Sequence, residues 1–182
     1  MSKIKSALSV RVLCRMAMLI ALEIVFERFL SIGTDALRIG FGFVPIVLCA
    51  VLFGPAHAAV VYAIADVIGA LLFYGSCMPG ITFDRALMGL MFGVFLLPLM
   101  LSDGNKLSFS KTIRMICPIA INCLILGLLL DSYWLSLIST KNSFYYLFTT
   151  RIIQYAVLIP VQLILTPFII TLAKRLRKAG IA

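Results

Sequence analysis

Four arginines stand out in this sequence because each lies at or beside the end of a long apolar run. They are Arg28, Arg38, Arg85 and Arg151. The guanidinium group of arginine is a planar fork that binds carboxylates through paired hydrogen bonds. If these side chains converge on one cavity, they would suit an anionic solute.

An acidic residue, Asp66, lies deep within an apolar run. A carboxylate inside a membrane span costs roughly 2.5–3.5 kcal/mol on insertion scales. Asp66 should therefore face the protein interior and have a partner, which is either an arginine of another helix or a ligand. Asn122 and Gln154 could bind an amide-like or guanidine-like edge of the same solute, although Asn122 could equally bond to a neighbouring helix. Thr82 lies at the start of the following apolar run.

Three aromatic residues, Phe73, Tyr133 and Trp134, offer flat faces on which a ring could stack. The alternative for Tyr133 and Trp134 is an aromatic belt at the membrane interface. Together with the polar residues, they predict a ligand that is aromatic, rich in hydrogen-bond donors at one end and acidic at the other.

The composition predicts an all-α integral membrane protein with a single domain. The chain has 182 residues, of which 63% are hydrophobic, whereas soluble domains are usually about 45–50% apolar. At about 20 residues per span, six spans nearly use up the chain. The predicted spans are residues 12–30, 39–53, 56–73, 81–101, 113–130 and 148–172.

The second predicted span is short and begins irregularly, at Gly40, Gly42 and Pro45. Irregular backbone at this depth is tolerated only where protein or a water-filled cavity covers it. We therefore expect its entrance to line a cavity. The Gly54–Pro55 pair leaves almost no room for a loop before the third span.

The placement of the basic residues predicts that both termini are cytoplasmic. The net charge is +9, and most Lys and Arg residues lie near the N-terminus, in the 102–114 loop and near the C-terminus. With six spans these three regions share one face, which the positive-inside rule assigns to the cytoplasm. The four arginines named first are exceptions on the outer side. Because the charge clusters at span ends, nucleic-acid binding is not expected.

No metal site, cofactor or disulfide framework is expected. The five cysteines lack C-x-x-C spacing, and His57 is the only histidine. A membrane enzyme acting on lipid would need clustered acids or paired His and Glu. Only Glu23 and Glu27 lie one helical turn apart, and one of them could pair locally with Arg28.

The first span contains the small-x-x-x-small pattern Ala17-x-x-x-Ala21, which allows another helix to approach closely. Packing within the chain and docking of a partner both remain open.

Segments spread over nearly the whole chain resemble the substrate-binding (S) components of energy-coupling factor (ECF) vitamin transporters, most closely the folate-specific type. The segments are Ala21–Val25, Arg28–Ile32, Arg38–Ile46, Leu52–Pro55, Ala65–Phe73, Pro79–Thr82 and Leu130–Leu135.

The resemblance implies a six-helix bundle in the bacterial cell membrane that binds folate near its outer side. Folate would contact the arginines, polar residues and aromatic residues named above. The first three helices, with Ala17 and Ala21, would dock on a module of one transmembrane T subunit and two ATPases. The chain has no phosphate-binding loop, so ATP hydrolysis is expected in those partners. Alternatives are an S component for riboflavin or a purine-like base, and a purely structural membrane subunit.

Overall fold

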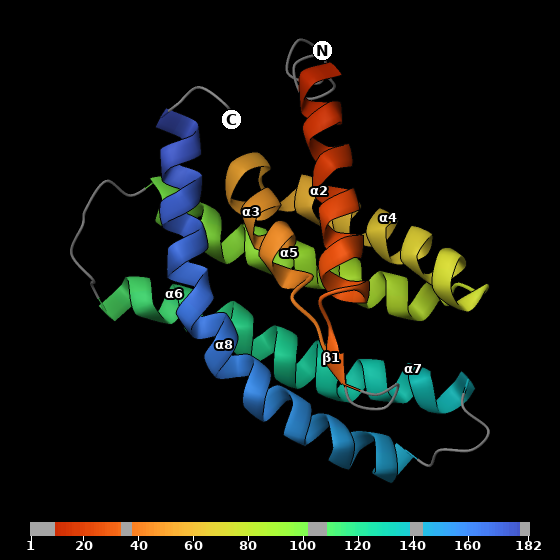
Figure 1. The fold of residues 1–182 in the computed structure, drawn as a ribbon. Helices are drawn as coiled ribbons and strands as arrows, with labels where there is room; N and C mark the ends of the chain where they lie inside the picture. Colours follow the sequence, from red (N-terminus) through yellow and green to blue (C-terminus); the bar gives the residue numbers. More distant parts are fainter. Residues whose placement is uncertain (1–9, 34–37, 102–108, 139–143, 179–182) are drawn as a thin grey trace.

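The computed structural model describes residues 10–33, 38–101, 109–138 and 144–178. In these ranges the chain forms six continuous helical segments and one short hairpin (Figure 1). The elements are α2 (Val10–Arg28), β1 (Ile32–Gly33), β2 (Arg38–Ile39), α3 (Phe43–Phe53), α4 (Pro55–Tyr74), α5 (Pro79–Leu101), α6 (Phe109–Ala120), the π-helix η1 (Ile121–Leu130), α7 (Asp131–Ile138) and α8 (Phe144–Lys178). The predicted all-α bundle is confirmed.

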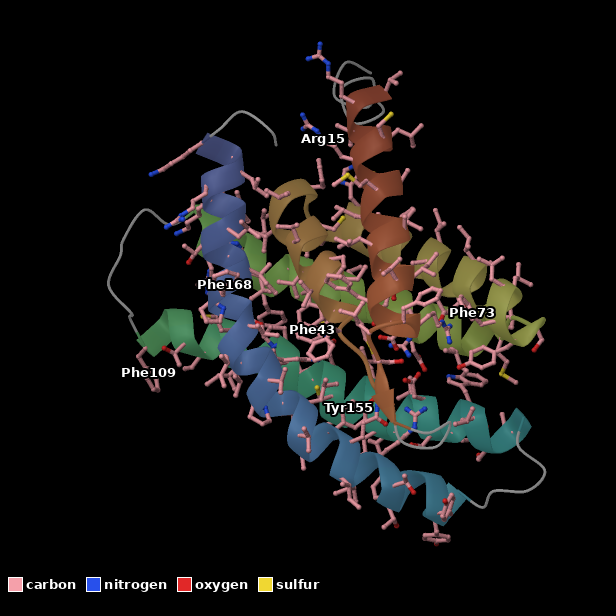
Figure 2. The ribbon with its side chains drawn as sticks, in the orientation of Figure 1. Arg15, Phe43, Phe73, Phe109, Tyr155 and Phe168 are labelled. Carbon is pink, nitrogen blue, oxygen red and sulfur yellow. The ribbon has the colours of Figure 1, made fainter. Side chains whose placement is uncertain are left out.

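Four helical segments of the described chain are long and apolar enough to cross a membrane: 55–74, 79–101, 112–137 and 148–178. Large apolar side chains cover the outside of the bundle, as Figure 2 shows for Phe109 and Phe168, which are 82% and 68% exposed. Phe43 and Tyr155 instead point inward and are less than 10% exposed. An apolar exterior of this extent suits a bilayer as the solvent.

Helix α3 forms the centre of the bundle. It has only 11 residues, so it is about 16 Å long and too short to cross the hydrocarbon layer. Its side chains Ile46, Val47, Cys49, Ala50 and Val51 are fully buried. The other helices must therefore surround it.

The turn between α3 and α4 depends on one glycine. Gly54 has a φ of +94°, a backbone conformation that side chains with a Cβ rarely adopt. Pro55 then occupies the first turn of α4, where its missing N–H has no cost. Helix α5 packs closely on this turn, because a Cβ at Gly93 would overlap Pro55.

The fifth helical segment differs from the prediction. The predicted span ends at residue 130, and residues 131–135 are expected to form a separate cluster at the membrane interface. In the structure α6, η1 and α7 run without a break, and α7 continues to Ile138. The middle part is a π-helix that begins three residues after Pro118, which lacks a backbone N–H. π-helical segments are rare in proteins, and those that do occur are frequently found at functional sites.

The beginning of α2 and the end of α8 lie at the same end of the molecule, at the top in Figure 1. The last turn of α2, the β1–β2 hairpin and α7 lie toward the other end. The cavity described next is at that second end.

Candidate functional site

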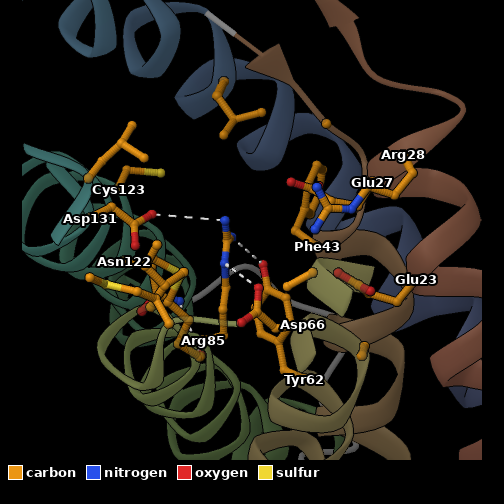
Figure 3. Close-up of a pocket in the computed structure, with 18 of the residues that line it drawn as sticks. Glu23, Glu27, Arg28, Phe43, Tyr62, Asp66, Arg85, Asn122, Cys123 and Asp131 are labelled. Carbon is orange, nitrogen blue, oxygen red and sulfur yellow. Dashed lines mark hydrogen bonds and ion pairs between the residues drawn. The ribbon is translucent and has the colours of Figure 1, made fainter. Parts of the chain in front are cut away.

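A cavity of about 750 Å³ opens between α2, α4, α5, η1, α7 and α8. Figure 3 shows it in close-up. A volume of this size holds a drug-sized or vitamin-sized molecule. Its charged and amide-bearing lining residues are Glu23, Glu27, Arg28, Asp66, Arg85, Asn122, Asp131, Arg151, Gln154 and Gln162.

Arg85, near the start of α5, lies in the middle of the cavity and contacts three other lining residues (Figure 3). Its Nη1 donates a 2.9 Å hydrogen bond to the Tyr62 hydroxyl. Its Nε is 4.0 Å from Asp66 Oδ1, and its Nη2 is 3.9 Å from Asp131 Oδ2. Arg85 thus connects α4 with α7 across the cavity.

Asp66 already has protein partners on both oxygens. Besides the contact of Oδ1 with Arg85, its Oδ2 accepts a 2.8 Å hydrogen bond from Thr82 Oγ1. Of the two alternatives that the sequence leaves open for Asp66, the structure contains the pairing with an arginine. Thr82 does not line the cavity and acts on it through Asp66.

Arg151 of α8 binds the π-helix and the start of α7. Its Nη1 donates to the Gly127 carbonyl oxygen at 2.9 Å and to Asp131 Oδ2 at 3.3 Å. Gln154, Leu158 and Gln162 follow it along the same side of α8 and also line the cavity. Arg151 is thereby held at the wall by a carbonyl oxygen within the π-helix and by a carboxylate.

Arg28 differs from the other two arginines of the cavity. Its guanidinium lies over the rings of Tyr74 and Phe73, 4.8 and 5.7 Å from their centroids. Among the described residues, no carboxylate lies within 4.0 Å of it. Phe73 is 48% exposed and outside the cavity lining, so it contacts Arg28 instead of offering a stacking surface inside the cavity.

Two carboxylates of α2, Glu23 and Glu27, line the cavity although the sequence did not single them out as binding residues. Glu23 is only 3% exposed. The chain near Gly40 and Gly42 approaches both side chains, because a Cβ on Gly40 would overlap the Glu27 carboxylate. In the sequence, the pattern that could have indicated this role is the acidic pair Glu23 and Glu27, one helical turn apart, together with the glycines Gly40 and Gly42.

The remaining predicted residues lie around the cavity and not in its lining. Trp134 packs over Gly80, where a Cβ would overlap its indole ring. Tyr133 is 53% exposed and meets Trp134 edge-on, with 5.3 Å between ring centroids. The backbone of Arg38 pairs with Gly33 in the β1–β2 hairpin, and its side chain lies outside the described part of the structure.

Two acceptor atoms at the opposite wall lack a hydrogen-bond partner in the described chain: Asn122 Oδ1 and Asp131 Oδ1. The Asn122 amide nitrogen is bound, because Nδ2 donates to the Met88 carbonyl oxygen at 3.3 Å. In total the described lining carries four carboxylates and three arginines. The cavity therefore offers a ligand more acceptors than the arginine pattern alone predicts. No cluster of three or more potential metal ligands occurs in the ranges that the structure describes.

A second, apolar groove of about 380 Å³ lies on the outside of the bundle between α2 and α4. Ala17 is one of its lining residues, whereas Ala21, also exposed, is not. His57 lies in the groove with Nδ1 2.8 Å from the Phe53 carbonyl oxygen, so its ring caps the end of α3. The lining residues are Leu13, Met16, Ala17, Ile20, Ala56, His57, Val60 and Ile64.

Comparison with known proteins gives consistent results. The family described as "ECF transporter, substrate-specific component" matches residues 11–170. The folate transporter FolT of Clostridium novyi (strain NT) is 35% identical over 156 residues, covering 85% of each chain. FolT of Leuconostoc mesenteroides subsp. mesenteroides is 31% identical over 160 residues, covering 85% of this chain and 82% of the relative. A crystal structure of FolT bound with folic acid superposes with a TM-score of 0.73 at 30% identity, covering 88% of this chain and 92% of the other.

Proposed function

Because the chain belongs to the family of ECF transporter substrate-specific components, we propose that it is the folate-binding subunit of an ATP-driven uptake transporter. Members of this family are components of membrane transporters. The chain is therefore a multi-pass membrane transport subunit and not an enzyme, as the sequence predicts. What the proposal adds is the solute, its place in the cavity and the source of energy.

The observation that carries the proposal is the set of polar groups around the cavity. Folate has a flat ring with several N–H donors, an aromatic linker and a glutamate with two carboxylates. Among the described residues, the cavity has unpaired acceptors at Asn122 and Asp131 for the donors and an arginine without an ion pair, Arg28, for a carboxylate. The structural likeness to FolT with folic acid supports the same solute.

The direct test is binding of folate by the purified chain in detergent or nanodiscs. Isothermal titration should give saturable binding of one folate per chain, with folate recovered chemically unchanged by mass spectrometry. Riboflavin and adenine should not displace it. Displacement by riboflavin or adenine, or no heat of binding with folate, would refute the choice of solute.

We further propose that folate enters from the outer side of the membrane and that the T subunit docks on the α2–α4 groove. The groove is almost entirely apolar and contains Ala17, so it suits a helix of a membrane partner. In this arrangement a T subunit with two ATPases binds at the groove and supplies the energy, while both termini are cytoplasmic. Accessibility of single cysteines introduced near Ser2 and Lys178 to a membrane-impermeant reagent tests the orientation, and labelling of intact cells at either position contradicts it.

A further inference from the structure

We propose that Glu23 is the residue that recognises the solute's ring, by accepting hydrogen bonds from adjacent amino and ring N–H groups of a 2-aminopyrimidinone. This inference rests on the proposed function and assigns the ring-binding role to a residue other than Asp66. The ligand chemistry required is an N–H pair on one edge of a flat ring, which a carboxylate binds through both oxygens.

The burial of Glu23 is the first argument. The residue is 3% exposed, it lines the cavity, and none of the ion pairs in the described chain includes its carboxylate. Leaving a buried carboxylate without a partner is costly, so buried charges are normally paired. A ligand with two donors on one edge would supply that missing partner.

The position of the neighbouring glycines is the second argument. A Cβ on Gly42 would lie 3.1 Å from Glu23 Oε1 and 2.8 Å from Glu27 Oε2. A Cβ on Gly40 would overlap the Glu27 carboxylate. At these two positions the chain after the hairpin therefore carries no side chain, and any side chain there would displace the two carboxylates from their places in the cavity lining.

The occupancy of the competing acid is the third argument. Both oxygens of Asp66 already have partners, because Oδ2 accepts a hydrogen bond from Thr82 Oγ1 and Oδ1 pairs with Arg85. Figure 3 shows Glu23 at the α2 wall of the cavity, across from Asn122, with Asp66 and Tyr62 between them. A flat ring bound between the two walls could meet Glu23 with one edge and, with another, Asn122 Oδ1, which has no hydrogen-bond partner among the described residues.

The test compares the binding of two ligands by each of three proteins. The ligands are folate and an analogue in which a methyl group replaces the 2-amino group. The proteins are the unaltered chain, Glu23→Gln, and Asp66→Asn as the matched control from the same cavity. Titration calorimetry measures the ratio of the two dissociation constants for each protein. Size-exclusion chromatography checks that each variant remains folded.

The unaltered chain should prefer folate over the analogue by about 10- to 150-fold, the range expected for hydrogen bonds to a charged group. In Glu23→Gln this preference should fall to a few-fold, whereas Asp66→Asn should keep it whatever its effect on affinity. A preference that survives Glu23→Gln, or that is lost in Asp66→Asn instead, overturns the inference.

A second variant covers the case in which Glu23→Gln does not fold. Gly42→Ala keeps every polar group and displaces the two carboxylates, so it should also reduce the preference for folate, and an unchanged preference counts against the inference. The two proposals fail differently. No folate binding by the unaltered chain refutes the proposed function, whereas folate binding with a preference independent of Glu23 refutes only the role of Glu23.

Discussion

Arg85 and Arg151, which come from α5 and α8, both approach the same oxygen of Asp131. Oδ2 of Asp131 is 3.9 Å from Arg85 Nη2 and 3.3 Å from Arg151 Nη1. Asp131 is nearly fully buried, and its Oδ1 has no partner in the described chain. One carboxylate thereby fixes the relative position of two arginines at the cavity wall.

Replacing Asp131 by Asn should destabilise the ligand-free protein. The change leaves Arg151 and one side of Arg85 without their shared counter-charge, and removing one partner of a buried pair costs about 3 kcal/mol. Chemical unfolding in detergent, followed by circular dichroism, measures the loss. Ser136→Ala on the exposed part of α7 is the control and should have little effect. Equal stability of Asp131→Asn and the unaltered chain would contradict the shared role.

Replacing Arg28 by Gln should weaken binding of folate more than binding of pteroate, which lacks the glutamate. Arg28 has no ion pair in the described chain and is held by the rings of Phe73 and Tyr74. A charge-assisted hydrogen bond to a carboxylate is worth about 1.5–3 kcal/mol, so folate affinity should fall at least tenfold. Titration with both ligands measures this, with Arg11→Gln at the far end of α2 as control. The same loss for both ligands would place the glutamate elsewhere.

Replacing Ala17 by Trp should abolish folate uptake while leaving folate binding intact. The indole would fill the apolar groove between α2 and α4, which we assign to the T subunit. Uptake of labelled folate into cells and copurification with the ATPase module measure the effect. Met18→Trp is the matched control, because Met18 is 69% exposed and lies outside the groove lining. Normal uptake with Ala17→Trp would move the docking surface to another face.

Replacing Gly93 by Ala should destabilise the bundle by about 1–3 kcal/mol, the usual effect of overpacking. The added Cβ would overlap the backbone of Pro55, which cannot move without disturbing the turn at Gly54. Thermal unfolding in detergent tests this. Val94→Ala, one position along on the exposed side of α5, should change the midpoint little. A midpoint for Gly93→Ala equal to that of Val94→Ala would show that the α4–α5 contact is looser than described.

Much of the helical framework follows from the sequence because apolar runs of membrane length have few alternatives. Of the arginines that stand at the ends of apolar runs, Arg28, Arg85 and Arg151 line one cavity together with Asp66, whereas the side chain of Arg38 lies outside the described part of the structure. Phe73 follows Asp66 by seven residues, which is about two α-helical turns, so the two side chains share one side of α4. Those two turns also carry Phe73 about 10 Å further along α4, beyond the cavity.

The role of Asp131 could not be predicted because it depends on the π-helix. Asn122 and Asp131 are nine residues apart. In an α-helix this is two and a half turns, which places the two side chains on opposite faces. A π-helix bonds residue i to i+5 and has about 4.4 residues per turn, so nine residues make about two turns and both side chains share a face. Both line the cavity.

The position of Glu23 depends equally on tertiary structure. In the sequence it belongs to an acidic pair beside Arg28, for which local pairing was a reasonable expectation. Its burial arises because the chain returns at Gly40 and Gly42 and closes over the end of α2. No local pattern within α2 contains that information.

The bonds of Arg85 to Tyr62, Asp66 and Asp131 have a consequence for the cavity when no ligand is bound. Because Arg85 is already bound to Tyr62, Asp66 and Asp131, a ligand group that approaches its guanidinium has to compete with two carboxylates of the protein, whereas Arg28 presents no such competition among the described ion pairs.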